Sequence, residues 1–174
     1  MSEYSSGYCR QLIAWFAAGL LLIGCDQAPK PTGLPGESDY RQVCAGCHGA
    51  DGAGRPPTFP PLAGGSLESL RPEAAVLIVL NGLRGEIEVD GQTYRGYMPP
   101  LPQIDDARLA RILAYLRARF APGWDEAAVS VERIAELRRQ NGAPRILVGR
   151  AGIDQRLREL NIRSPEGPAD DDAP

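Results

Sequence analysis

Sulfur and imidazole side chains are scarce in this 174-residue chain, which has four cysteines, two methionines and one histidine. Two of the cysteines and the histidine stand together in the segment Cys44-Ala45-Gly46-Cys47-His48. The C-x-x-C-H spacing is typical of covalent haem attachment. It places two thiols one helical turn apart, where each can form a thioether with a haem vinyl group. The adjacent imidazole is then directed at the iron from the proximal side.

The first 25 residues have the pattern of an export signal. Arg10 precedes an almost uncharged apolar run, residues 11–23, which is shorter than the ~20 residues that a membrane span needs. The run ends in Leu22-Ile23-Gly24-Cys25, which resembles the bacterial lipobox, where the cysteine receives a diacylglycerol. An uncleaved amino-terminal anchor is the alternative. In both cases we expect export to the periplasmic side of a bacterial membrane and attachment there, and Asp26 favours the inner membrane.

Two other interpretations of the C-x-x-C-H segment are a disulfide redox pair and a zinc site. A thioredoxin-like pair is expected at the start of a helix that follows a strand, and no strand pattern precedes Cys44. Zinc needs a fourth ligand. With Cys9 removed in the signal segment and Cys25 lipidated, the mature chain has no other thiol or imidazole. These residues therefore favour one covalently attached haem c.

Met98 is the predicted second axial ligand of the iron. Met1 leaves with the signal segment, so Met98 is the only thioether of the mature chain, 50 residues after His48. An isolated methionine is ordinarily core filling. This one stands before Pro99-Pro100, in a segment that we expect to be a stiff loop ahead of a helix. With His48 and Met98 both bound, the iron has no open position, which argues against oxygen or peroxide chemistry.

Four elements are expected to position these ligands. The patterns of apolar, capping and turn residues predict a helix from the N-cap Ser38 to Cys47, a helix from Pro72 to Asn81, a hairpin of residues 86–89 and 92–95 around Asp90-Gly91, and a helix after the N-cap Asp105. Residues 49–65, rich in glycine and proline, are expected to form a loop along the edge of the haem.

Residues 37–120 resemble a class I, monohaem cytochrome c. The motifs that carry the resemblance are Cys44-x-x-Cys47-His48, Pro60-x-Leu62-x-Gly64 and Met98-Pro99. The resemblance implies an all-α fold with three to four helices around one haem and, in some branches, a small β-hairpin before the methionine loop. It also implies that Pro60 and Leu62 lie at the cofactor, and that the Pro60 carbonyl accepts a hydrogen bond from His48. The first and last helices are expected to cross through Tyr40 and Tyr115.

Composition and segment boundaries complete the expected organisation. A net charge of −3 and a pI of about 5.3 leave no basic surplus for phosphates, so nucleic acid is not an expected partner. The capping pattern predicts a helix from Ser130 to Gly142, and weaker patterns suggest a strand at 145–149 and a helix at 154–160. The predicted segments are a signal peptide (1–24), a Pro/Gly-rich tether (25–37), a cytochrome c domain (38–120), a helical extension (121–163) and a disordered acidic tail (164–174).

The predicted function is electron transfer by a lipid-anchored cytochrome rather than catalysis. The expected partners are redox proteins: a dehydrogenase or quinol-oxidising complex as donor, and a terminal oxidase or reductase as acceptor. The alternatives are a haem subunit of an enzyme complex, a non-catalytic subunit that holds a complex together, and a haem peroxidase or gas sensor in which Met98 is displaceable.

Overall fold

The computed structural model describes residues 30–162. The predicted signal segment, the lipidated Cys25 and the acidic tail therefore lie outside the described residues. The chain divides after Lys30, and the unit that begins at Pro31 contains every element described below. In this part of the chain, no helix is long and apolar enough to cross a membrane.

The first helix, α2 (Glu37–Val43), crosses α5 (Asp106–Phe120) as the family resemblance implied. The rings of Tyr40 and Tyr115 are fully buried at the crossing, with centroids 5.0 Å apart. The Asp105 side chain caps α5 by accepting a hydrogen bond from the Arg108 amide at 2.8 Å, as predicted.

The predicted N-cap of the first helix is wrong: Gly36 caps α2, and Ser38 lies inside it. Gly36 has φ 82°, and a Cβ at this position would overlap the carbonyl of Arg111 on α5. The close crossing of the two helices therefore selects a glycine where the local pattern favoured serine. The buried Glu37 carboxylate reaches back to accept hydrogen bonds from the amides of Thr32 (2.7 Å) and Gly33 (2.8 Å).

The first helix is also not continuous to Cys47. It ends at Val43, and a second short helix, α3 (Ala45–His48), follows after Cys44. Hydrogen bonds continue through the break, from the Cys44 amide to the Tyr40 carbonyl and from the His48 amide to the Cys44 carbonyl. The change at Cys44 (φ −108°) therefore redirects the last turn while keeping the helical hydrogen bonds.

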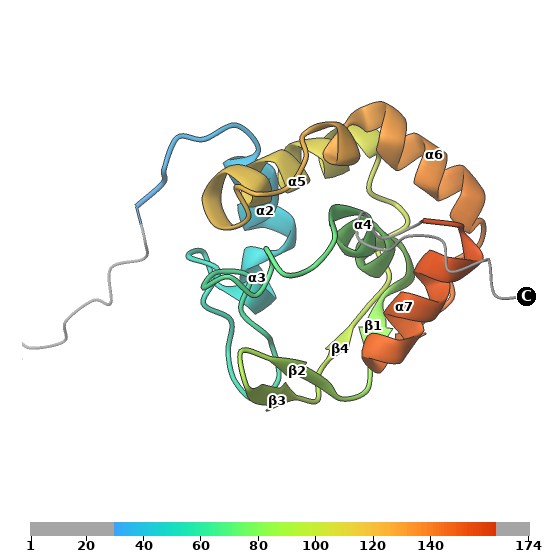
Figure 1. Ribbon diagram of the computed structural model, residues 1–174. Coiled ribbons are helices and arrows are strands. Elements are labelled where there is room, and N and C mark those ends of the chain that lie inside the picture. The colour runs from blue at the N-terminus through green and yellow to red at the C-terminus, as the bar shows by residue number, and fades with distance from the viewer. Residues whose placement is uncertain (1–29, 163–174) are drawn as a thin grey trace, which may run out of the picture. The chain divides into compact units, whose positions relative to one another are not determined.

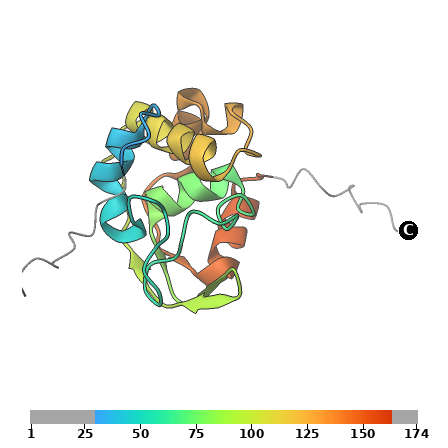
Figure 2. The same cartoon turned by 90° about the vertical axis from the view of Figure 1, so that its left-hand side faces the viewer.

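Helix α4 (Pro72–Asn81) and the hairpin of β2 (Ile87–Val89) and β3 (Gln92–Tyr94) confirm their predictions. Asp90 (φ 52°) and Gly91 (φ 74°) both adopt the left-handed conformation that a primed hairpin turn needs. Figures 1 and 2 show α4 at the centre of the fold.

A three-stranded sheet was not predicted. Its order is β4 (Tyr97–Met98), β1 (Leu83–Arg84) and β5 (Leu147–Val148), with β4 antiparallel and β5 parallel to the central β1. Met98 therefore lies in a strand and not in the expected loop. Strands of two residues are too short to show an alternating pattern in sequence.

The C-terminal elements pack onto the same core. They are the 3₁₀ helix η1 (Ala127–Val129), α6 (Val131–Asn141) and α7 (Gly149–Glu159). The cap of α6 by Ser130 confirms its prediction, whereas α7 begins five residues earlier than predicted. Ile134, Leu137, Ile153 and Leu157 join one buried apolar cluster with Tyr40 and the α4 and α5 side chains. The described fold is thus mainly helical, as predicted for a cytochrome c, with two small sheets, one of which contains Met98.

Candidate haem-binding site

The two thiols of the C-x-x-C-H segment are free and lie on one turn of helix. Cys44 precedes α3 and is half-buried, whereas Cys47 within α3 is exposed. Residues three apart face the same side of a helix. Burial, with the neighbouring Cys47, raises the pKa of the Cys44 thiol to about 12, so this thiol stays protonated at neutral pH. Two free thiols on one turn of helix fit the addition of S–H across two vinyl groups, a reaction that needs no oxidant.

His48 is held by the carbonyl of Pro60. Its Nδ1 lies 2.9 Å from the Pro60 oxygen, the contact that the family resemblance implied. A carbonyl oxygen only accepts, so Nδ1 must carry the proton and Nε2 keeps the lone pair. Burial lowers the pKa of His48, and the Pro60 hydrogen bond opposes that shift in part. The imidazole is therefore neutral at pH 7 with one nitrogen available to a metal.

The loop that carries Pro60 is fixed by backbone contacts with the haem motif. The Gly54 amide donates to the His48 carbonyl at 2.8 Å, and the Leu62 amide donates to the Gly52 carbonyl at 2.8 Å. Gly54 has φ 70°, and a Cβ there would lie 2.5 Å from the Phe59 oxygen and 2.7 Å from the Pro60 carbonyl carbon. Gly54 therefore permits the approach that brings the Pro60 carbonyl to His48.

Met98 is half-buried and lies opposite Leu83 in the three-stranded sheet. Gly82, the C-cap residue that follows α4, packs directly against its backbone. A Cβ on Gly82 (φ 74°) would lie 2.6 Å from the Met98 oxygen and 2.7 Å from the Pro100 nitrogen. The end of α4 thus fixes the backbone of the methionine strand.

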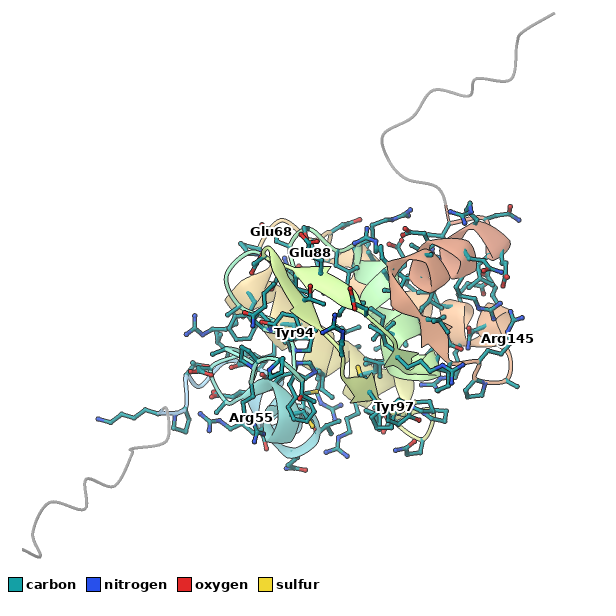
Figure 3. The ribbon with its side chains drawn as sticks, turned by 90° about the horizontal axis from the view of Figure 1, so that it is seen from below. Arg55, Glu68, Glu88, Tyr94, Tyr97 and Arg145 are labelled. Carbon is teal, nitrogen blue, oxygen red and sulfur yellow. The ribbon has the colours of Figure 1, made fainter. Side chains whose placement is uncertain are left out.

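The histidine and methionine sides meet through the loop that follows the C-x-x-C-H segment. The Arg95 amide donates to the Pro57 carbonyl at 3.2 Å, and Gly96 packs so closely on the Thr58 carbonyl that a Cβ would overlap it. In Figure 3, which views the protein from below, Arg55 of this loop lies to the left of Tyr97 of β4. Two free thiols, an imidazole with a free Nε2 and a thioether form a donor set that fits haem c.

Sequence reasoning missed the residues that support these groups. Gly54 lies between His48 and Pro60 in the sequence and Gly82 follows the helix predicted to end at Asn81, and these positions were the available signal. Asn81, Asn141 and Arg156 form a buried hydrogen-bonded network at the end of α4, and no sequence pattern singles them out.

Comparisons with known proteins also support a haem c site. Residues 31–116 match the family model described as cytochrome c oxidase, cbb3-type, subunit III. Cytochrome c-552 of Thermus thermophilus is 41% identical over 96 residues, which cover 53% of this chain and 70% of that protein. A cytochrome c-552 from a second Thermus thermophilus source is also 41% identical over 96 residues, with 62% of its length covered. Dihydro-heme d1 dehydrogenase of Pseudomonas aeruginosa is 38% identical over 100 residues, which are 58% of this chain and only 17% of that protein.

Proposed function

We propose, from the premise that this chain belongs to the class I monohaem c-type cytochromes and binds haem c, that it relays single electrons at the periplasmic face of a bacterial membrane. Electron transfer is the role that the family supports. The location, the anchor and the identity of the partners are the parts that this proposal adds.

In this proposal, Cys44 and Cys47 anchor the haem and His48 and Met98 bind its iron. Bound haem supplies an iron that changes between ferric and ferrous states. The observation that carries the assignment is the 2.9 Å contact between His48 Nδ1 and the Pro60 oxygen, because it leaves Nε2 as the donor and raises its basicity. The soft sulfur of Met98 favours the ferrous state and, together with His48, keeps other ligands away from the iron.

The proposed anchor is a lipid on Cys25, supported by the lipobox-like sequence before it. The proposed partners are a dehydrogenase or quinol-oxidising complex and a terminal oxidase or reductase. The names of the matched family and of the Pseudomonas relative both denote oxidoreductases, which supports partners of this class.

A second candidate is a haem subunit fixed within an oxidoreductase complex. It is favoured by the Pseudomonas relative, in which the similar region makes up only 17% of a longer protein named as a dehydrogenase. Co-purification in mild detergent separates the two, because a fixed subunit remains with stoichiometric partners and a relay does not.

The test of the proposed function is Met98→Ala in the haem-loaded protein. We expect water to enter the sixth position, the ferric iron to become largely high spin, the reduction potential to fall and CO to bind readily. Tyr97→Ala is the control, because Tyr97 is the preceding residue of the same strand and is 56% exposed. An unchanged potential and spin state in Met98→Ala would show that the ligand is wrong. Ready CO binding by the unaltered protein would favour a gas sensor or peroxidase instead.

A further inference from the structure

We propose that residues 131–162, here called the C-terminal segment, position Met98 for the iron, with Arg138 and Asn141 as the positioning residues. This inference rests on the proposed function, in which Met98 is an axial ligand. The matched family region ends at residue 116, so the whole C-terminal segment lies outside it.

The first connection runs through the three-stranded sheet. Leu83 in the central strand faces Met98 on one side and Leu147 of the C-terminal segment on the other. The Leu147 amide donates to the Gly82 carbonyl at 3.2 Å, and Leu147 itself is buried. Gly82 in turn touches the backbone of Met98. The C-terminal segment therefore completes the sheet whose opposite edge carries the methionine.

A buried polar network fastens this connection. The Asn81 and Asn141 side chains donate to each other at 2.9 and 3.2 Å, and the Arg145 amide donates to Asn81 at 2.9 Å. The Arg156 guanidinium donates to the Asn141 side chain at 2.9 Å and to Glu159 at 2.8 Å. Asn81 is the last residue of α4, so the network holds residues 141–145 against the turn that leads into β1. Asn141 links both halves, and its loss would leave buried donors and acceptors unpaired.

The second connection reaches the residues that follow Met98. Arg138 on α6 donates from Nη1 to the Pro102 carbonyl at 2.8 Å, from Nη2 to the Ile104 carbonyl at 2.5 Å, and from Nε to Asp106 at 2.7 Å. One side chain therefore ties the chain between β4 and α5 to the C-terminal segment. The C-terminal segment thus restrains the Met98 region both through the sheet and after the ligand.

Such restraint affects iron binding because a preorganised ligand loses less conformational entropy when it binds. A free ligand such as imidazole competes with Met98 for the same position. If the methionine strand is held less firmly, the bound state of Met98 becomes less favourable, and imidazole gains affinity by the same factor.

The test compares two arginines on α6 in the haem-loaded, full-length protein. Arg138→Ala removes the bonds to the methionine side, whereas Arg133→Ala removes an ion pair with Glu73 at the start of α4. The two side chains are matched in exposure, at 28% and 32%. We expect imidazole affinity of the ferric protein to rise about tenfold in Arg138→Ala and to stay unchanged in Arg133→Ala. Asn141→Ala is the second variant and is expected to shift the affinity in the same direction.

Two further measurements separate positioning from general stability. The far-red absorption band of a methionine–ferric haem pair should weaken in Arg138→Ala and Asn141→Ala, and hydrogen exchange of residues 97–104 should speed up. A merely structural role would lower the free energy of unfolding in all three variants and leave imidazole affinity and the band unchanged.

That result would overturn the positioning role while leaving the electron-transfer proposal intact. An unaltered protein that lacks the band, or a Met98→Ala protein that keeps it, would instead overturn the ligand assignment.

Discussion

Replacing Gly54 with alanine tests whether the Pro60 carbonyl tunes His48, the proposed proximal ligand. The Gly54 amide donates to the His48 carbonyl, and its Cα faces the Phe59 carbonyl oxygen and the peptide between Pro60 and Pro61. A Cβ there would stand 2.5 Å from the Phe59 oxygen and 2.7 Å from the Pro60 carbonyl carbon. The backbone from the Phe59 carbonyl to the Pro60–Pro61 peptide must therefore move, by about 0.9 Å at the Phe59 oxygen, to reach an ordinary contact distance of 3.4 Å. A hydrogen bond of 2.9 Å from His48 to the Pro60 oxygen does not survive such a movement intact.

The destabilisation expected for Gly54→Ala has three contributions. A left-handed φ of 70° costs alanine ~1–2 kcal/mol, the steric conflict ~1–3 kcal/mol, and the lost hydrogen bond ~0.5–1.5 kcal/mol. We expect the free energy of unfolding to fall by about 3 kcal/mol or more. The less basic imidazole stabilises the ferric state less, and a loss of ~0.5–1 kcal/mol there raises the potential by roughly 20–40 mV for a one-electron couple.

The assay is denaturant unfolding together with spectroelectrochemical titration of the haem-loaded protein. Gly91→Ala is the matched control, because Gly91 has nearly the same φ, 74°, but a methyl group added there would have nothing within 4 Å, so it carries only the backbone strain. The reasoning is refuted if Gly54→Ala destabilises no more than Gly91→Ala, or if its potential stays the same or falls.

Three further predictions concern the thiols, the anchor and the N-terminal contact of the domain. The double variant Cys44→Ala/Cys47→Ala should lose haem stain on a denaturing gel, and retained covalent haem would contradict the attachment site. Cys25→Ser should abolish incorporation of labelled palmitate, and unchanged labelling would place the anchor elsewhere. Burial opposes ionisation of Glu37, but hydrogen bonds from Thr32, Gly33 and Arg41 outweigh it and hold the pKa below its ordinary value. A lowered folded-state pKa gives stability that is present above the ordinary value of 4.5 and is lost as the pH falls below it. The free energy of unfolding of Glu37→Gln should therefore fall less steeply than that of the unaltered protein as the pH decreases below 4.5. Equal slopes for the two proteins would disprove the linkage.

Local signals in the sequence predicted most of the helical framework. Asp105 and Ser130 cap their helices because a side-chain oxygen reaches the amide three residues ahead, an interaction contained within four residues. The same holds for the Asp90-Gly91 turn. The haem motif was equally visible because its chemistry needs a fixed spacing.

The parts of the fold and of the site that were not predicted depend on contacts between residues far apart in the sequence. Gly36 replaces Ser38 as the cap only because Arg111 lies 75 residues further along against it. The pairing of Leu83 with Leu147 and the buried Asn81–Asn141 pair likewise join segments about 60 residues apart. None of these contacts produces a periodic pattern in the sequence. The residues that support the Met98 backbone are therefore identified only from the three-dimensional structure.

The order of strands in the three-stranded sheet also constrains the order in which folding and haem attachment can occur. The central strand contains Leu83, but its parallel neighbour Leu147 lies 64 residues later in the chain, so the sheet cannot close until nearly the whole described chain is available to fold. The thiols of Cys44 and Cys47 are made first, and Cys44 becomes half-buried in the finished fold. Late closure would therefore give the proposed attachment reaction an interval in which both thiols are accessible, and the proposed binding of Met98 to the iron would follow once the sheet has closed.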